Sequence, residues 1–122
     1  ILQTKDVRPM LQTYIVIELE AHTLSLYQNG HLQQTFPVAL GKQNTPTPAG
    51  NWHIINKKIL TDSGPFGSRW MGLNHHDYGI HGTNNPAAIG GNVSLGCIRM
   101  HNAHVEQLFD AVSIGTPVII TP

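Results

Sequence analysis

The 122-residue sequence predicts a single mainly β domain, a sandwich or distorted barrel of mixed sheets with one short helix. Only 11% of the residues are charged, whereas the chain has 12 glycines and 8 prolines, a composition that favours turns and strands over surface helices. Most apolar residues lie in short β-branched or alternating runs, which is the pattern of strands. We expect residues 13–121 to form the core of this domain and residues 1–12 to flank it.

Three strands are predicted between residues 14 and 40. The run TYIVIELE is apolar and β-branched, and in the following TLSLYQ two leucines alternate with other residues. Asn29 and Gly30 accept the positive φ angles that a two-residue hairpin needs, so residues 31–40 should return as the partner strand. The next segment, GKQNTPTPAG, is predicted to be a loop, because its two Thr-Pro steps favour extended backbone and Gly50 closes it.

The rest of the chain is less regular. NWHIINKKIL predicts a strand with Trp52 and Ile54 on one face, and the final TPVIITP predicts a closing strand. Residues 61–96 are rich in Gly, Asn, Pro and Ser, which is typical of a binding or catalytic surface. A helix should follow, with Asn102 as its N-cap and Gly115 at its end. Its apolar stripe comprises Val105, Leu108, Phe109 and Val112.

Composition weighs against several functions. Seven Lys and Arg balance seven Asp and Glu, so no net charge favours nucleic acid or an anionic membrane as a partner. No apolar run approaches the roughly 20 residues that span a bilayer. A single cysteine excludes an internal disulfide and a multi-cysteine zinc or iron–sulfur site. The chain begins with Ile1 rather than methionine, and we expect a targeting segment to lie outside it. The sequence indicates no oligomeric state.

The stretch VSLGCIRMHN, residues 93–102, holds the one cysteine, Cys97. A thiol becomes a useful nucleophile when a nearby base or positive charge favours the thiolate. Of the eight histidines, His81 has the most informative setting, because YGIHGT places it at the end of a short apolar strand. Cys97 is therefore a candidate nucleophile with His81 as its base. The alternative is a buried structural cysteine beside a structural histidine.

Residues around Cys97 can extend such a site. Gly96 allows a tight backbone, so that backbone N–H groups can point at a developing oxyanion. Arg99 would share the strand face of Cys97, which makes it a candidate anchor for a substrate carboxylate, although a surface ion pair is the ordinary role of such an arginine. The Ser94 hydroxyl can orient His81 or the loop.

The ordered pattern GIHGTNNPAAIGGNVSLGCIRM resembles the signature of the L,D-transpeptidase catalytic domain, the YkuD family, in which His-Gly is followed by Ser/Thr-x-Gly-Cys and an arginine. The resemblance extends over residues 14–120. It includes the opening strands, the Thr-Pro-Thr-Pro-x-Gly loop, the segment GPFGSRWMGL and the closing GTPVII. Two positions depart from the pattern: Leu95 stands where the family often has histidine, and His104 stands where it often has aspartate.

This resemblance implies roles for particular residues. Cys97 would be the nucleophile and His81 its general base, while the Gly82 carbonyl would accept the other imidazole N–H and fix the tautomer. Backbone N–H groups of residues 95–97 would form the oxyanion hole. The residues expected to bind substrate or brace the site are Arg99, Ser94, Gly96 and Leu95.

The implied reaction is a two-step acyl transfer on peptidoglycan stem peptides, the expected partners. Cys97 would attack the carbonyl of the third residue of a stem tetrapeptide and release D-alanine, and an amine of a neighbouring stem would take the acyl group to give a 3→3 cross-link. With water as acceptor, the same site would be an L,D-carboxypeptidase. The resemblance also implies no metal or nucleotide cofactor, acylation by carbapenems, and a location outside the cytoplasm, in the bacterial cell envelope.

Two other interpretations compete with this one. Cys97, His101 and His104 lie close together in sequence, and HHD at residues 75–77 adds further metal-ligand types, but C-x3-H-x2-H is not a standard zinc spacing. A non-catalytic peptidoglycan-binding domain would keep the fold and the cleft without needing the cysteine and the histidine.

Overall fold

The computed structural model of the protein describes residues 12–75 and 77–122. Nearly all of the expected flank, residues 1–12, and His76 of the HHD stretch lie outside the described residues. In chain order the elements are β1 (Thr13–Glu18), β2 (Thr23–Gln28), β3 (His31–Pro37), β4 (Leu40–Gly41), β5 (Gly50–Ile59), β6 (Arg69–Leu73), β7 (Gly79–His81), the 3-10 turn η2 (Pro86–Ala88), β8 (Asn92–Ser94), β9 (Ile98–Arg99), α1 (Asn102–Ala111) and β10 (Pro117–Thr121).

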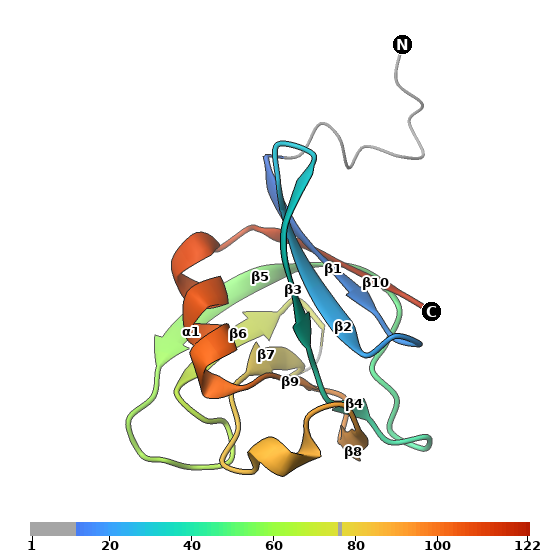
Figure 1. The fold of residues 1–122 in the computed structure, drawn as a ribbon, viewed down its shortest axis with the longest axis vertical. Helices are drawn as coiled ribbons and strands as arrows, with labels where there is room; N and C mark the ends of the chain where they lie inside the picture. Colours follow the sequence, from blue (N-terminus) through green and yellow to red (C-terminus); the bar gives the residue numbers. More distant parts are fainter. Residues whose placement is uncertain (1–11, 76) are drawn as a thin grey trace.

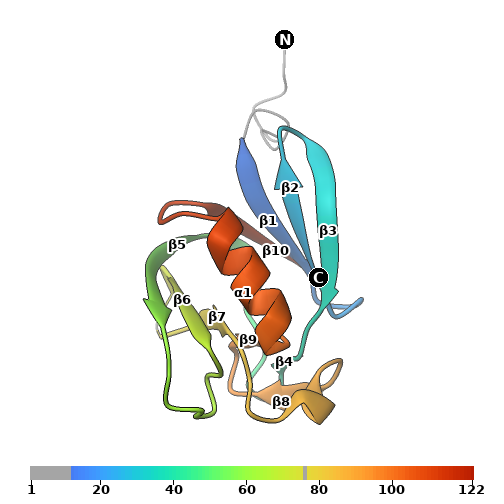
Figure 2. The ribbon, with the colours of Figure 1, turned by 60° about the vertical axis from the view of Figure 1, so that its left-hand side comes forward.

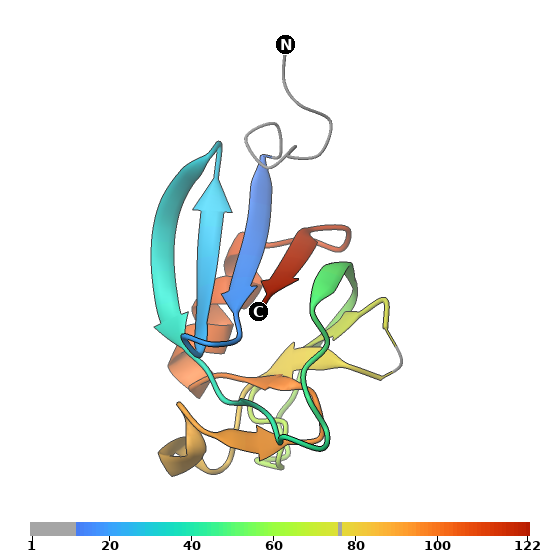
Figure 3. The same cartoon turned by 90° about the vertical axis from the view of Figure 1, so that its right-hand side faces the viewer.

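Eight of the strands form one mixed, curled sheet in the order β3-β2-β1-β10-β5-β6-β7-β9, and β4 pairs with β8 (Figure 1). β1 and β10 run parallel, as do β7 and β9, whereas the other neighbours in the large sheet are antiparallel. Figure 3 shows β1, β2 and β3 side by side as one wing of the sheet, apart from β6 and β7. The predicted mainly β fold with mixed sheets and one α-helix is confirmed for the described part of the chain.

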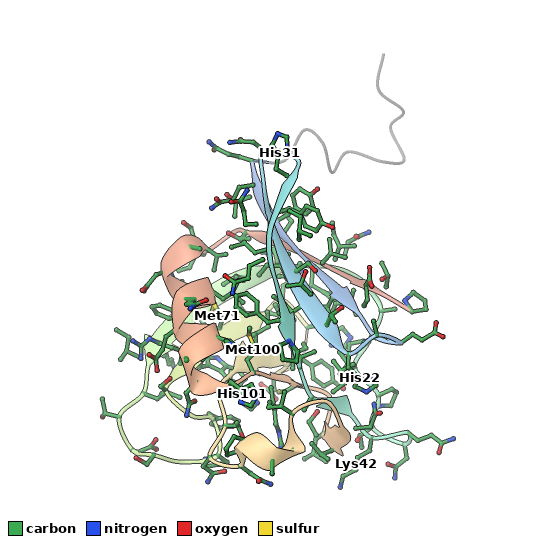
Figure 4. All side chains as sticks on the ribbon, viewed as in Figure 1. His22, His31, Lys42, Met71, Met100 and His101 are labelled. Atoms are coloured by element: carbon green, nitrogen blue, oxygen red, sulfur yellow. The ribbon has the colours of Figure 1, made fainter. Side chains whose placement is uncertain are left out.

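The core lies beneath α1, which crosses the sheet over β6 and β7 (Figure 2). Met71 of β6 and Met100, just after β9, lie behind the helix in the interior (Figure 4). Both side chains are fully buried, and the helix contributes Val105 and Leu108 to the same cluster. One face of the sheet is therefore buried in the core. The opposite face of β6, β7 and β9 is available for a functional site.

Several predicted local features are present. Asn29 and Gly30 have φ angles of 54° and 79°, and they join β2 to β3 as a two-residue hairpin. In β5, Ile54 is fully buried and Trp52 packs against the same core from the same face. These features depend on neighbours in sequence, which is why residue pattern predicts them.

Other segments differ from the expectation. The strand predicted over residues 31–40 ends at Pro37, and the chain then changes sheets to form β4. The segment 61–96 contains three short strands, of which β7 was predicted and β6 and β8 were not. β6 is sandwiched between β5 and β7, so its neighbours stabilise it despite its glycine and its short length.

The start of α1 also differs from the prediction. His101, not Asn102, occupies the N-cap position, with φ −56° and ψ 144° and without a side-chain cap. Asn102 is the first helical residue, and its side chain turns back onto the segment that follows β7. Its Oδ1 accepts hydrogen bonds from the N–H groups of Ser68 and Thr83, both at 3.1 Å, and its Nδ2 donates to the Thr83 carbonyl at 3.0 Å.

The end of α1 was predicted at Gly115 but lies at Ala111. Lys57 of β5 donates hydrogen bonds to the carbonyls of Phe109 and Val112, both at 2.7 Å. These carbonyls at the end of the helix have no partner within it, so a strand distant in sequence provides their hydrogen-bond donor. Within residues 12–75 and 77–122, no helix has the length and apolar character to cross a membrane.

We predict that Asn102→Ala destabilises the fold. The substitution leaves the half-buried Thr83 N–H without its acceptor, a loss of about 1–3 kcal/mol, and also removes the exposed bond from the Ser68 N–H. Urea denaturation followed by circular dichroism measures the free energy of unfolding. Asn85→Ala is the matched control, because that side chain is exposed and caps nothing. Equal stability of the two variants would contradict the proposed contribution of Asn102.

Candidate active site

The pairing of β7 with β9 builds the site. The two strands run parallel, with Ile80 opposite Ile98 and His81 opposite Arg99. Both isoleucines are fully buried in the core, so the flanking residues face the other side of the sheet. There His81, Cys97 and Arg99 line one cavity of about 360 Å³. The structure thus brings together the three residues that the sequence singled out from separate segments.

Aromatic residues form much of the cavity wall. The residues that line it are Pro65, Phe66, Trp70, Asp77, Tyr78, His81, Ser94, Leu95, Cys97 and Arg99. A second cavity of about 450 Å³ adjoins it and shares Phe66, Trp70, Asp77 and Tyr78. The sequence analysis did not assign Phe66 or Tyr78 to the site. The feature that could have indicated them is that each is an aromatic residue within an otherwise glycine-rich, irregular segment.

His81 is held in one tautomer. Its Nδ1 lies 2.6 Å from the Gly82 carbonyl oxygen, and because a carbonyl can only accept, Nδ1 carries the hydrogen. The Nε2 of the neutral ring is then left with its lone pair, as a base requires. The side chain is only 2% exposed, and this burial lowers the pKa of His81 to about 4. The bond to Gly82 raises that pKa, and the charge of Arg99 lowers it further, both less strongly than burial acts.

Two aromatic rings enclose the imidazole. Trp70, opposite His81 on β6, stacks on it with 5.7 Å between centroids and an interplanar angle of 17°. Phe66 meets the same ring edge-on at 4.9 Å. The Trp70 indole N–H donates to Asn56 Oδ1 at 3.0 Å, so the stacked ring is itself oriented from β5. This enclosure accounts for the desolvation that depresses the His81 pKa.

The Gly82 carbonyl is fixed by its surroundings. The Gly82 N–H donates to the Arg69 carbonyl at 3.2 Å, and Asn102 holds the next residue, Thr83, through two hydrogen bonds. A side chain at position 82 would collide with the Asn102 amide, so glycine is required here. The orientation of the histidine therefore depends on a residue at the start of α1.

Cys97 is half-buried, and its thiol lies 3.8 Å from the Asp77 carbonyl, a weak hydrogen bond. Burial raises the pKa of this thiol; the backbone of Gly79 and the charge of Arg99 oppose that effect, and Asp77 adds to it. With a raised thiol pKa and a lowered imidazole pKa, both groups are neutral at pH 7. These directions disfavour a standing thiolate–imidazolium pair.

Ser94 orients the loop that carries Cys97. Its hydroxyl donates to the Cys97 carbonyl at 2.7 Å and accepts from the Gly96 N–H at 3.0 Å. The Gly96 N–H is therefore already engaged, which leaves the N–H groups of Leu95 and Cys97 as the predicted oxyanion donors. The Leu95 side chain is 72% exposed at the rim of the cavity.

Arg99 lies beside His81 with its backbone fixed. It exchanges two backbone hydrogen bonds with Ala39, at 2.8 and 3.0 Å. Its Nε is buried, and no group in residues 12–75 and 77–122 accepts a hydrogen bond from it. An arginine that lines a cavity and has an unsatisfied guanidinium nitrogen suits a ligand carboxylate.

The residues considered for a metal site do not converge. The rings of His101 and His104 lie 5.3 Å apart, and His104 packs beside Phe36, whereas Cys97 faces the cavity. Among the described residues, no three His, Cys, Asp or Glu side chains are placed to share a metal ion.

Comparison with known proteins identifies relatives. The model of the YkuD family, the L,D-transpeptidase catalytic domain, matches residues 12–120. The putative L,D-transpeptidase YkuD of Bacillus licheniformis is 49% identical over 108 residues, which cover 88% of this chain and 65% of that protein. L,D-transpeptidase 1 of Mycobacterium tuberculosis is 30% identical over 123 residues, which cover 84% of this chain and 48% of that protein. The chain thus spans less than two thirds of either relative.

Solved structures agree with this assignment. The catalytic domain of the Enterococcus faecium L,D-transpeptidase superposes with a TM-score of 0.78 at 29% identity, covering 91% of this chain and 98% of that one. The L,D-transpeptidase LdtMt1, solved in complex with imipenem, superposes with a TM-score of 0.78 at 28% identity, covering 90% of this chain and 59% of that one. With its fold and its family match in agreement, the chain belongs to the YkuD family as an L,D-transpeptidase catalytic domain.

Proposed function

We propose that the protein cross-links peptidoglycan stem peptides 3→3 through a thioester on Cys97. The observation that carries this proposal is the cavity in which Cys97 accompanies His81, whose tautomer the Gly82 carbonyl fixes. His81 Nε2 takes the thiol proton as Sγ attacks the carbonyl carbon of the third stem residue. The C–N bond to the terminal D-alanine then breaks, and the imidazolium returns the proton to the leaving amine.

In the second half-reaction the same two side chains act on the thioester. An amine of a neighbouring stem gives its proton to His81 and attacks the thioester carbonyl. The C–S bond breaks, an amide forms, and the thiol recovers its proton from the imidazolium. The two adjoining cavities, which meet at Trp70 and Tyr78, offer room for both stems. Water as the acceptor would make the enzyme an L,D-carboxypeptidase.

Other parts of the proposal concern binding and location. We assign Arg99 to a substrate carboxylate, since this cationic side chain lines the cavity beside Cys97 and its Nε has no acceptor among the described residues. Ser94, Leu95 and Gly96 shape the wall beside the thiol. A relative solved with imipenem supports acylation of Cys97 by carbapenems. With peptidoglycan as the proposed substrate, we propose a location in the bacterial cell envelope, outside the cytoplasm.

Incubation with a disaccharide tetrapeptide should release D-alanine and form a cross-linked dimer, both detected by mass spectrometry. Cys97→Ala should eliminate product, and His81→Ala should lower the rate about 10²–10⁴-fold, because it removes the base. His53→Ala, at an exposed histidine outside the cavity, is the control and should retain activity. Tripeptide without dimer would indicate a carboxypeptidase. Product from Cys97→Ala would contradict the mechanism, and no product from the wild type would favour a binding domain.

Acylation should remain constant from pH 7 to about 5 and fall as His81 is protonated near pH 4. The sign follows from burial, which disfavours the imidazolium, so the neutral base persists well below the usual histidine pKa. Imidazole NMR gives the titration midpoint, and the rate of adduct formation with imipenem gives the kinetic profile. Thiolate absorbance should be missing at pH 7, because the pKa of Cys97 is raised. A midpoint near 6.5 would refute this arrangement.

Arg99→Ala should raise the KM for the stem tetrapeptide roughly tenfold, the scale of one lost charged hydrogen bond. Steady-state kinetics on a range of tetrapeptide concentrations measures this effect. Lys42→Ala removes an exposed cation outside the cavity and serves as the control. If Arg99→Ala leaves KM unchanged, Arg99 does not bind the substrate.

A further inference from the structure

The loop between β4 and β5 holds the peptide groups next to Cys97. Thr47 Oγ1 donates to the Gly96 carbonyl at 2.9 Å, and Thr45 Oγ1 donates to the Ser94 carbonyl at 2.9 Å. Figure 3 shows this loop running past β8 on its way to β5. Residues some fifty positions before the cysteine therefore contact the backbone on either side of Leu95.

The two prolines explain why both hydroxyls face the same way. Thr45 precedes Pro46 and Thr47 precedes Pro48, and the residue before a proline is restricted to extended backbone. In extended backbone, side chains two positions apart lie on the same side. The Thr-Pro-Thr-Pro sequence thus presents two hydroxyls to the Cys97 loop, one to the Ser94 carbonyl and one to the Gly96 carbonyl.

Thr47 has no freedom to direct its hydrogen elsewhere. The side chain is 4% exposed, and its oxygen already accepts a hydrogen bond from the Gly41 N–H at 3.0 Å. The one hydroxyl hydrogen therefore goes to the Gly96 carbonyl. A side chain at Gly41 would meet the Thr47 N at 2.7 Å, so the close fold of this loop requires glycine there.

Fixing the Gly96 carbonyl also fixes the Cys97 N–H. A trans peptide is planar, and its C=O and N–H point in opposite directions. The Cys97 N–H therefore points away from Thr47. Gly96 must itself be glycine, because its φ is +126° and a side chain there would collide with the Tyr78 ring.

We propose that Thr47 is a positioning residue for acyl transfer: its hydroxyl aims the Cys97 N–H at the oxyanion that forms when the thiol attacks. This inference rests on the proposed role of Cys97 as nucleophile. The Gly96 N–H is occupied by Ser94, so the oxyanion hole depends on the N–H groups of Leu95 and Cys97, and the direction of the second is what Thr47 controls. Thr45 matters less, because the Ser94 carbonyl also accepts from the Lys42 N–H at 3.0 Å.

Two reactions of the same thiol test the proposal. Imipenem acylates through an oxyanion: the S–C bond forms, the lactam C–N bond breaks, and the ring nitrogen takes the thiol proton. Iodoacetamide alkylates at a tetrahedral carbon and releases iodide, so no oxyanion develops. Mass spectrometry gives both rates. The ratio of acylation to alkylation corrects for a shifted thiol pKa, which changes both rates in the same direction, and an unchanged circular dichroism spectrum shows that a variant is folded.

Thr47→Val should lower this ratio roughly tenfold or more, because a misdirected donor stabilises the oxyanion poorly. Thr47→Ala should give the same loss without placing a methyl group against the Gly96 carbonyl. Thr47→Ser keeps the hydroxyl, and Thr45→Val keeps the Lys42 donor, so both should stay within about threefold of the wild type.

An unchanged ratio in Thr47→Val and Thr47→Ala would overturn the inference and reduce Thr47 to a support of the fold. An equal loss in Thr45→Val would also overturn it, because the effect would not be specific to the Gly96–Cys97 peptide. Absence of an imipenem adduct in the wild type would instead refute the proposed function of Cys97.

Discussion

The parallel pairing of β7 with β9 is the constraint on which the site depends. Ile80 and Ile98 face each other fully buried, and burying such a side chain stabilises the fold by about 1.5–3 kcal/mol. A slip of β9 by one residue would turn that strand over, exposing Ile98 and burying Cys97 and Arg99. The core therefore fixes the register, and the register places His81 beside Arg99 and on the same face as the thiol.

The enclosure of His81 has a chemical consequence. Trp70 and Phe66 exclude water from the ring, which disfavours its charged form and makes the neutral pair with Cys97 the resting state. An imidazolium with so low a pKa is a stronger acid than usual, which suits the proposed return of its proton to a leaving amine. The same burial weakens His81 as a base for the thiol, and Gly82, which favours the charged ring, offsets part of that loss.

Sequence pattern predicted the parts of the fold that depend on neighbouring residues. Alternation located the opening strands, and Asn29-Gly30 located their hairpin. It misplaced both ends of α1, because they are determined by residues distant in sequence. Asn102 is drawn to Thr83 and Ser68, and Lys57 reaches the last turn from β5. Family resemblance picked out His81, Gly82 and Cys97, whereas Phe66 and Tyr78 carry no spacing that separates cavity walls from surface aromatics.

Much of the proposed chemistry belongs to backbone groups, which no side chain identifies in the sequence. The Gly82 carbonyl orients the base, and the Cys97 N–H is the proposed oxyanion donor. Each is aimed by a side chain from another element, Asn102 for the first and Thr47 for the second. Positions 82 and 96 must both be glycine. A side chain at position 82 would collide with Asn102, and one at position 96 would collide with the Tyr78 ring. The proposed active site therefore includes residues such as Asn102 and Thr47 that position backbone groups. Conservative substitutions of these residues distinguish an effect on the orientation of those groups from an effect on folding.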